Sequence, residues 1–112
     1  MIAGIYNLKF DEGADIDIQF IWKDDTATPI NLIGYTARMK VKNTIDGDSV
    51  VDWGSYITLG GSDGTVNLNV PASATIDIGF LDGVYDIELV SNAGNVYKFL
   101  KGKVLITPEV TN

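Results

Sequence analysis

Residues 13–42, GADIDIQFIWKDDTATPINLIGYTARMKVK, hold the two clearest alternating patterns in the sequence and decide its fold class. Every second residue between 15 and 22 is apolar, with polar side chains between them, which is typical of a strand with one buried face. The alternation returns over residues 35–42, where apolar and polar side chains again point to opposite faces. The apolar positions are Ile16, Ile18, Phe20 and Trp22, then Tyr35, Ala37, Met39 and Val41. A turn-rich loop joins the two runs, so the stretch predicts an all-β domain.

Shorter patterns of the same kind extend the prediction along the chain. Further strands are expected over residues 5–10, 49–53, 55–59, 65–70, 83–90 and 96–106. GGSDG at 60–64 makes residues 65–70 the hairpin partner of the run before it, and SNAGN at 91–95 joins the last two strands. Pro71 ends the strand before it, residues 72–80 allow one helical turn at most, and Gly102 predicts a bulge or a bend in the last strand.

Eight short strands with regular turns indicate a β-sandwich or a small barrel, and Tyr85 favours the sandwich. The run LDGVYDI at 81–87 is similar to the tyrosine corner of immunoglobulin-like domains, in which a tyrosine hydroxyl folds back onto upstream backbone. The alternative is an ordinary core tyrosine in a hairpin. We predict an immunoglobulin-like antiparallel β-sandwich of about seven to eight strands over residues 1–108, with a short C-terminal tail at 109–112.

The charge balance bears on possible partners. The 112 residues include only 8 Lys and Arg against 15 Asp and Glu, a net charge of −7, and this gives no basic stripe to neutralise phosphates. We therefore expect no nucleic-acid partner and no binding to anionic membranes. No stretch reaches the roughly 20 apolar residues of a membrane span, and the N-terminus lacks the pattern of a cleaved signal. Cytosolic assembly is compatible with the absence of cysteine.

The sequence offers little catalytic chemistry. It has no histidine and no cysteine, which excludes Ser-His-Asp and Cys-His relays and imidazole or thiolate metal ligands. The carboxylate pairs Asp15 with Asp17 and Asp86 with Glu88 could serve a glycosidase, but a solvated strand face explains them better. Residues 46–48 and 62–64 could offer oxygens to calcium, but turn chemistry is the simpler reason for them. We predict no enzyme, no cofactor and no metal site.

Aromatic side chains are the remaining candidates for recognition. Trp53 and Tyr56 flank Gly54 in a short segment, and together with Tyr97 they are candidates for a protein interface or for stacking on a sugar. Packing inside the sandwich is the alternative. The basic residues of the second strand, Arg38, Lys40 and Lys42, would pair with Asp15, Asp17 and Gln19 if the two strands were neighbours.

Three strings together carry a family resemblance. They are residues 13–42, then YITLGGSDGTVNLNVPASAT at 56–75, then LDGVYDIELVSNAGNVYKFLKGKVLITPEV at 81–110. In this order they resemble small tailed-bacteriophage proteins and the N-terminal domain of phage baseplate upper proteins. The family motifs are a strand ending in TWKD, a P-I-D-L-T-G-Y-T loop, a G-T-V-x-L-x-V-P strand, a G-x-Y-x-Y-D-L-E-L strand and a final G-x-V-x-V-x-P-E-V. Trp22, Lys23 and Asp24 match the first motif; Asn31 and Ile33 depart from the second.

The resemblance implies a non-enzymatic structural component of a virion, assembled in the host bacterial cytoplasm and associated with the tail or baseplate. Its partners would be other virion proteins and further copies of itself. Two alternatives stay open: a capsid decoration or head-fibre protein, and a carbohydrate-binding module that uses Trp53, Tyr56 and Tyr97. Some family members carry long C-terminal receptor-binding extensions, and the resemblance over residues 13–110 does not imply the host-receptor role of those extensions.

Overall fold

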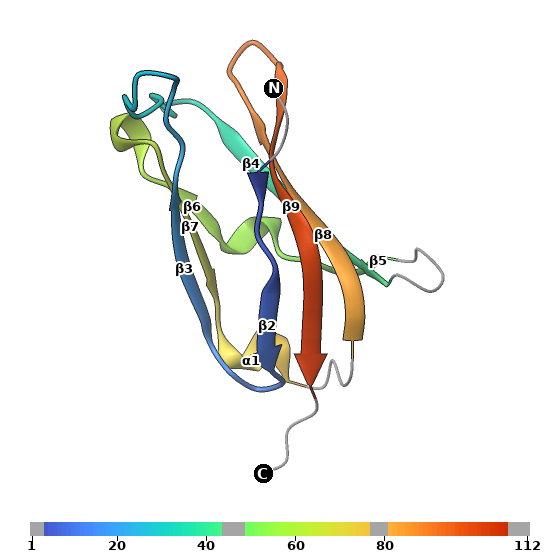
Figure 1. Cartoon of the computed structure of the whole chain (residues 1–112). Coiled ribbons are helices and arrows are strands. Elements are labelled where there is room, and N and C mark those ends of the chain that lie inside the picture. The colour runs from blue at the N-terminus through green and yellow to red at the C-terminus, as the bar shows by residue number, and fades with distance from the viewer. Residues whose placement is uncertain (1–3, 44–48, 77–80, 108–112) are drawn as a thin grey trace.

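The computed structural model describes residues 4–43, 49–76 and 81–107, and two packed β-sheets dominate them (Figure 1). The strands are β1 (Gly4–Ile5), β2 (Leu8–Asp11), β3 (Ile16–Ile21), β4 (Thr36–Asn43), β5 (Ser49–Asp52), β6 (Ile57–Leu59), β7 (Thr65–Val70), β8 (Leu81–Val90) and β9 (Val96–Thr107). One helical turn, α1 (Ala72–Thr75), and two 3₁₀ turns, η1 (Gly54–Tyr56) and η2 (Gly61–Asp63), complete them. All eight runs expected from alternation form strands, with the first divided into β1 and β2.

The two sheets differ in size and in strand direction. The larger has the order β1-β9-β8-β4-β5, with β2 also paired to β9, and the smaller has the order β3-β7-β6. Most pairs are antiparallel, but β1 and β2 both run parallel to β9. The large sheet is therefore mixed, whereas the small sheet is antiparallel, and the prediction of a wholly antiparallel sandwich is wrong at the edge formed by β1 and β2. The reason is that the first strand pairs with the last one rather than with its neighbour in sequence.

The core lies between the sheets, where the alternating apolar residues meet. Met39 and Val41 of β4 and Ile87 and Leu89 of β8 face the buried side chains of β7. The β7 residues Val66, Leu68 and Val70 are each at most 1% exposed. Strand β7 pairs with both β3 and β6, so the hairpin expected between residues 55–59 and 65–70 is confirmed. Burial of one face of each strand is the main stabilising contribution to this fold.

Gly102 has a different role from the predicted one. The register shift in the β8–β9 ladder falls between Ile87 and Glu88, which leaves Phe99 as the extra residue of β9, so a bulge at Gly102 is wrong. Phe99 and Leu100 are accordingly both buried. At Gly102 the carbonyl of Tyr6 crosses the strand so closely that a Cβ atom would lie 2.1 Å from its oxygen. Glycine is required here because backbone approaches backbone.

The connections follow the turn signals. SNAGN closes the β8–β9 hairpin with a bond from the Ser91 amide to the Asn95 carbonyl, as predicted. Pro71 ends β7 and α1 is a single turn, also as predicted, and residues 77–80 lie outside the described part. The buried Thr75 hydroxyl joins α1 to the β2–β3 turn, because it donates to the Ala14 carbonyl and accepts from the Gly13 amide. Residues 108–112, which include the predicted tail, also lie outside the described part.

Candidate interaction surfaces

Trp53 lies in the core. It follows β5, its side chain is 2% exposed, and its ring centroid is 5.9 Å from that of Phe10. Its amide donates to the Met39 carbonyl, which fixes the segment against β4. A ring enclosed in this way presents no face to a partner or a sugar, so the prediction of Trp53 as an interface residue is wrong, and packing explains it.

Tyr56 and Tyr97 are half-buried and lie in different places. Tyr56 ends η1 and packs against the core. Tyr97 lies on β9 in an aromatic cluster, with ring centroids 5.4 Å from Trp22 and 6.2 Å from Tyr35. The structure therefore does not bring the three predicted aromatics together. The sequence pattern predicted only that Trp22 and Tyr35 face the core, and it did not predict their cluster with Tyr97. Their positions at the two ends of the β3–β4 connection could have indicated that they lie close together.

Tyr85 joins the N-terminal segment to the core of the large sheet. Its ring is buried, and its hydroxyl donates to the carbonyl oxygen of Tyr6. The acceptor is upstream, but it lies 79 residues away rather than in the turn before β8. Tyr85 and Gly102 are also register partners, so the Tyr6 carbonyl sits where these two residues meet. Burial raises the pKa of Tyr85 to about 12, because the phenolate would lose its hydration.

The outer face of the large sheet gathers most of the basic residues of the chain. Six of the 8 Lys and Arg line one shallow hollow of about 790 Å³ on this face. They are Arg38, Lys40 and Lys42 on β4 and Lys98, Lys101 and Lys103 on β9. We call this surface the basic face. The premise that the chain has no basic stripe is therefore wrong, because β4 and β9 both pair with β8 and bring two short basic runs together.

Strand register arranges the basic face in three rows across β4, β8 and β9. The first row is Arg38, Glu88 and Lys98, the second is Lys40, Asp86 and Lys101, and the third is Lys42, Val84 and Lys103. Each row thus has a basic side chain at both ends. The central position holds a carboxylate in the first two rows and an apolar side chain in the third.

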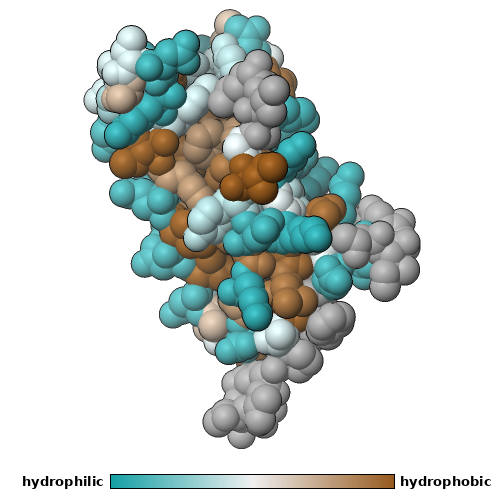
Figure 2. Space-filling model, in the orientation of Figure 1, coloured by the Kyte–Doolittle hydropathy of each residue, from teal (hydrophilic) through white to brown (hydrophobic). Residues whose placement is uncertain are grey.

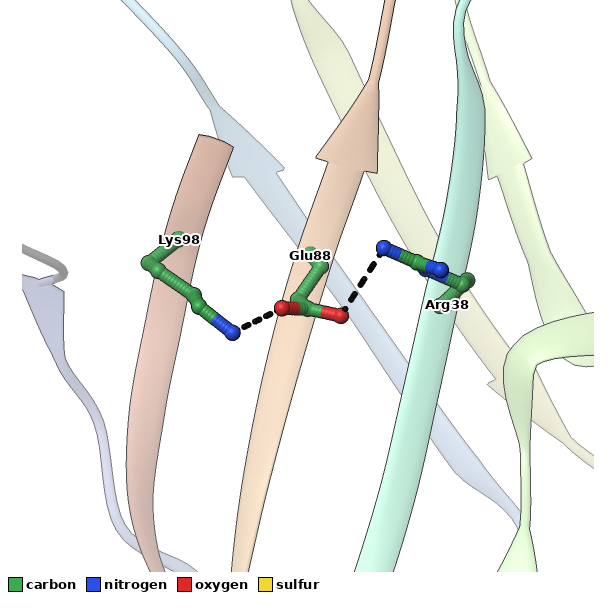
Figure 3. Close-up of polar contacts among 3 residues, drawn as sticks. All are labelled: Arg38, Glu88 and Lys98. Carbon is green, nitrogen blue, oxygen red and sulfur yellow. Dashed lines mark hydrogen bonds and ion pairs between the residues drawn. The ribbon is translucent and has the colours of Figure 1, made fainter. Parts of the chain in front are cut away.

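The first row is closed by two ion pairs (Figure 3). Arg38 Nη2 lies 3.2 Å from Glu88 Oε1, and Lys98 Nζ contacts the other carboxylate oxygen. The Lys98 hydrogen bond is the main cause that lowers the pKa of Glu88, and Arg38 adds to it. Glu88 in turn raises the pKa of Lys98. Both ion pairs are exposed to solvent, because the side chains of Arg38 and Lys98 remain more than half exposed.

The charge pairs expected between the first two strands do not form, because β3 and β4 belong to different sheets. On the outer face of the small sheet Gln19 donates to Asn67, and Asn69 donates to Asp17. Asp15 accepts from the Ala72 amide at 2.6 Å and so caps α1. Both carboxylates of the first predicted pair therefore have structural hydrogen bonds to neighbouring segments.

A second hollow separates the two sheets at one side of the sandwich. It has a volume of about 340 Å³ and is lined by residues 6–10 and 15–18. Among the described residues, β2 pairs only with β9 and β3 only with β7, so each has an open edge. Figure 2 shows apolar surface in the gap between these strands. Open edges and apolar surface together are features of surfaces that take part in association.

The acidic turns do not form a metal centre. No group of three or more His, Cys, Asp or Glu side chains that could hold a metal ion occurs in residues 4–43, 49–76 and 81–107. Asp63 instead accepts from the Thr65 hydroxyl and amide, and these bonds lower its pKa. Residues 46–48, the other predicted calcium candidate, lie outside the described part.

Comparison with known proteins adds no assignment. No protein-family model matches the chain, and no curated protein matches it. In the part of the chain that the structure describes, no helix is long and apolar enough to cross a membrane.

Proposed function

We propose that this domain is a non-enzymatic structural component of a tailed-phage virion, associated with the tail or baseplate, which assembles through protein–protein contacts. The proposal rests on the resemblance of residues 13–42, 56–75 and 81–110 to small phage virion proteins and to the N-terminal domain of phage baseplate upper proteins. Two surfaces of the described residues support assembly through protein–protein contacts. They are the basic face and the open edges of β2 and β3.

We further propose that the sandwich is immunoglobulin-like. The order β9-β8-β4-β5 corresponds to strands G, F, C and C′ of variable-type immunoglobulin domains, and β3-β7-β6 corresponds to B, E and D. This strand order is the single structural observation that carries the assignment. Tyr85 supports it less strongly, because its hydroxyl binds the first strand rather than the turn before its own strand.

The non-enzymatic reading is supported by what the carboxylates do. Asp15, Asp17 and Glu88 each accept a hydrogen bond or form an ion pair with a neighbouring segment. The sequence offers no histidine or cysteine to work beside them. The carbohydrate-binding alternative is weakened, since Trp53 is enclosed in the core.

The experiment is immunogold electron microscopy of particles from the source culture, with antibody raised against this chain. We expect gold at the tail tip. Gold spread over the head would replace the proposal with the capsid-decoration reading. A virion role would be refuted if the particles carried no gold and mass spectrometry of the denatured particles also failed to detect the chain. A strain with the coding sequence deleted is the matched control.

A further inference from the structure

We propose that the basic face binds the Asp24–Asp25 turn of a second copy of the chain, so that copies associate head to tail. This inference rests on the proposed assembly role and names the surfaces that would carry it. The contact joins two different surfaces and is therefore heterologous, so repetition would give a ring or an open row.

The third row of the basic face has room for an additional carboxylate. Glu88 and Asp86 supply one negative charge to the first and second rows, but Val84 occupies the corresponding place in the third. Lys42 and Lys103 thus flank an apolar side chain that is 41% exposed. Neither lysine forms an ion pair within the described residues. A carboxylate that lay over Val84 would complete the pattern of the two rows beside it.

The turn between β3 and β4 presents suitable carboxylates in a fixed shape. Asp24 Oδ1 accepts from the Thr26 amide at 2.9 Å and from the Thr28 amide at 3.0 Å. The Asp24 amide also donates to the Thr28 carbonyl, and Lys23 pairs with Pro29 as an isolated bridge. Because the turn is held by its own hydrogen bonds, little conformational entropy is lost when it docks.

Asp25 is the free carboxylate of this turn. It is exposed, and it has no hydrogen bond or ion pair in the described part of the chain. The turn projects at one end of the sandwich, where β3 of the small sheet connects to β4 of the large sheet (Figure 1). Asp24 stays ionised, because the Thr26 and Thr28 hydrogen bonds lower its pKa. The turn therefore offers two negative charges side by side.

Charge complementarity favours another copy as the partner. The basic face carries six basic and two acidic side chains, Asp86 and Glu88. Subtracting these from the 8 basic and 15 acidic residues of the chain leaves 2 basic and 13 acidic residues elsewhere. The remainder of a second copy thus carries mainly acidic charge, and the Asp24–Asp25 turn is one part of it. Opposite charges on two such surfaces steer them together and fix their orientation.

The details of the face fit a folded protein better than a nucleic acid. Its central strand carries the carboxylates Asp86 and Glu88, which would repel a continuous phosphate backbone laid across the rows. Its one aromatic residue, Tyr85, is buried, so the lining offers no ring on which a base can stack. Ile5 and Val84 add exposed apolar surface of the kind that protein interfaces bury.

The experiment is sedimentation velocity of the purified full chain over a range of concentrations, at about 50 mM and at about 500 mM salt. We expect reversible association at low salt and monomers at high salt. Lys103→Glu and Asp25→Lys should each weaken association by about tenfold or more. An equimolar mixture of these two variants should restore it, because the reversed face of one accepts the reversed turn of the other.

The double variant Ser55→Glu with Thr58→Glu is the matched control, because it changes the net charge by the same amount as Lys103→Glu at two exposed positions outside the linings of both hollows. It should associate like the wild type. A monomeric wild type at low salt, equal loss in the Ser55→Glu/Thr58→Glu control, or no restoration in the mixture would each overturn the inference. Binding of a labelled oligonucleotide that Lys103→Glu abolishes would reassign the face to nucleic acid. Gold labelling of particles is independent of these results, so the virion proposal can fail or stand separately.

Discussion

The outer face of the large sheet is organised by ion pairs, whereas the outer face of the small sheet is organised by amide side chains, one of which binds the carboxylate of Asp17. On the large sheet Glu88 forms ion pairs with basic residues of both neighbouring strands. On the small sheet Gln19 donates to Asn67 at 2.9 Å, and Asn67 donates to the Thr58 carbonyl. Both solutions satisfy the polar side of a half-buried strand, but only the first produces a field that reaches beyond its own sheet. The difference identifies the large sheet as the face that can choose a partner by charge.

Gly102→Ala should have the largest effect, because it disturbs the edge of the large sheet. A Cβ atom there would meet the Tyr6 carbonyl oxygen at 2.1 Å, so β1 and β2 would have to leave β9. We expect the free energy of unfolding to fall by about 3 kcal/mol or more, measured by urea denaturation. Gly4→Ala is the control, because its new Cβ meets the Leu100 side chain at 3.2 Å and the Phe99 carbonyl oxygen at 3.7 Å, which is an ordinary contact distance. A loss of similar size in both variants would contradict this role for Gly102.

Tyr85→Phe tests the same edge more gently. It removes the hydroxyl that donates to the Tyr6 carbonyl and leaves the acceptor without its partner, at a cost of about 1–2 kcal/mol. The folded-state pKa of Tyr85 is raised to about 12 from 10.0, so the stability it contributes is complete below pH 10 and is lost as the pH rises towards 12. Denaturation at several alkaline pH values should therefore show a steeper fall for the wild type than for Tyr85→Phe. Parallel curves would exclude this contribution.

Glu88→Gln removes the central charge of the first row of the basic face. The partners Arg38 and Lys98 are largely exposed, so we expect a loss of at most about 1 kcal/mol, which shrinks as salt is added. The pKa of Glu88 is lowered below 4.5, so its contribution is present above that pH and is lost as the pH falls through the lowered pKa. Thermal unfolding between neutral and acidic pH, at low and high salt, measures both effects. A salt-independent loss would mean that the row acts through packing.

Asn67→Ala on the small sheet should give the smallest effect. It removes the acceptor for Gln19 and the donor to Thr58, both exposed, at a cost of about 0.5 kcal/mol. Since no charge is involved, this loss should not change with salt or between neutral and acidic pH, in contrast to Glu88→Gln. The same thermal series measures it. Equal salt dependence in the two variants would remove the distinction between the faces.

Alternation predicted the strands well because the period of two is a local property of the chain. The pairing of strands is not local. Neighbours in sequence, β3 and β4, separate into different sheets, while the first strands join the last. The register shift in the β8–β9 ladder falls at Phe99, and the two consecutive apolar residues Phe99 and Leu100 could have predicted it. The prediction placed the irregularity at Gly102 because glycine is common at such positions. The residues next to Gly102 in the sequence gave no indication that the Tyr6 carbonyl lies against it in the fold.

The candidate surfaces show the same limit. The alternating pattern predicted that Arg38, Lys40 and Lys42 share the solvent-facing side of one strand. They lie on the same surface as the lysines of β9 only because both strands pair with β8. Composition alone therefore concealed the basic face, because the acidic residues outnumber the basic ones in the chain as a whole. Burial of Trp53 was equally non-local, since it depends on Phe10 and Met39.

The parallel pairing of β2 with β9 has a mechanical consequence. Because the first and last strands point the same way, tension applied between Gly4 and Thr107 pulls the two strands past each other along their length. All hydrogen bonds of the ladder then bear the load together and must break nearly at once, whereas an antiparallel terminal hairpin would open one bond after another. The domain is thus connected so as to resist stretching along its axis, with Tyr85 and Gly102 holding the middle of the loaded ladder.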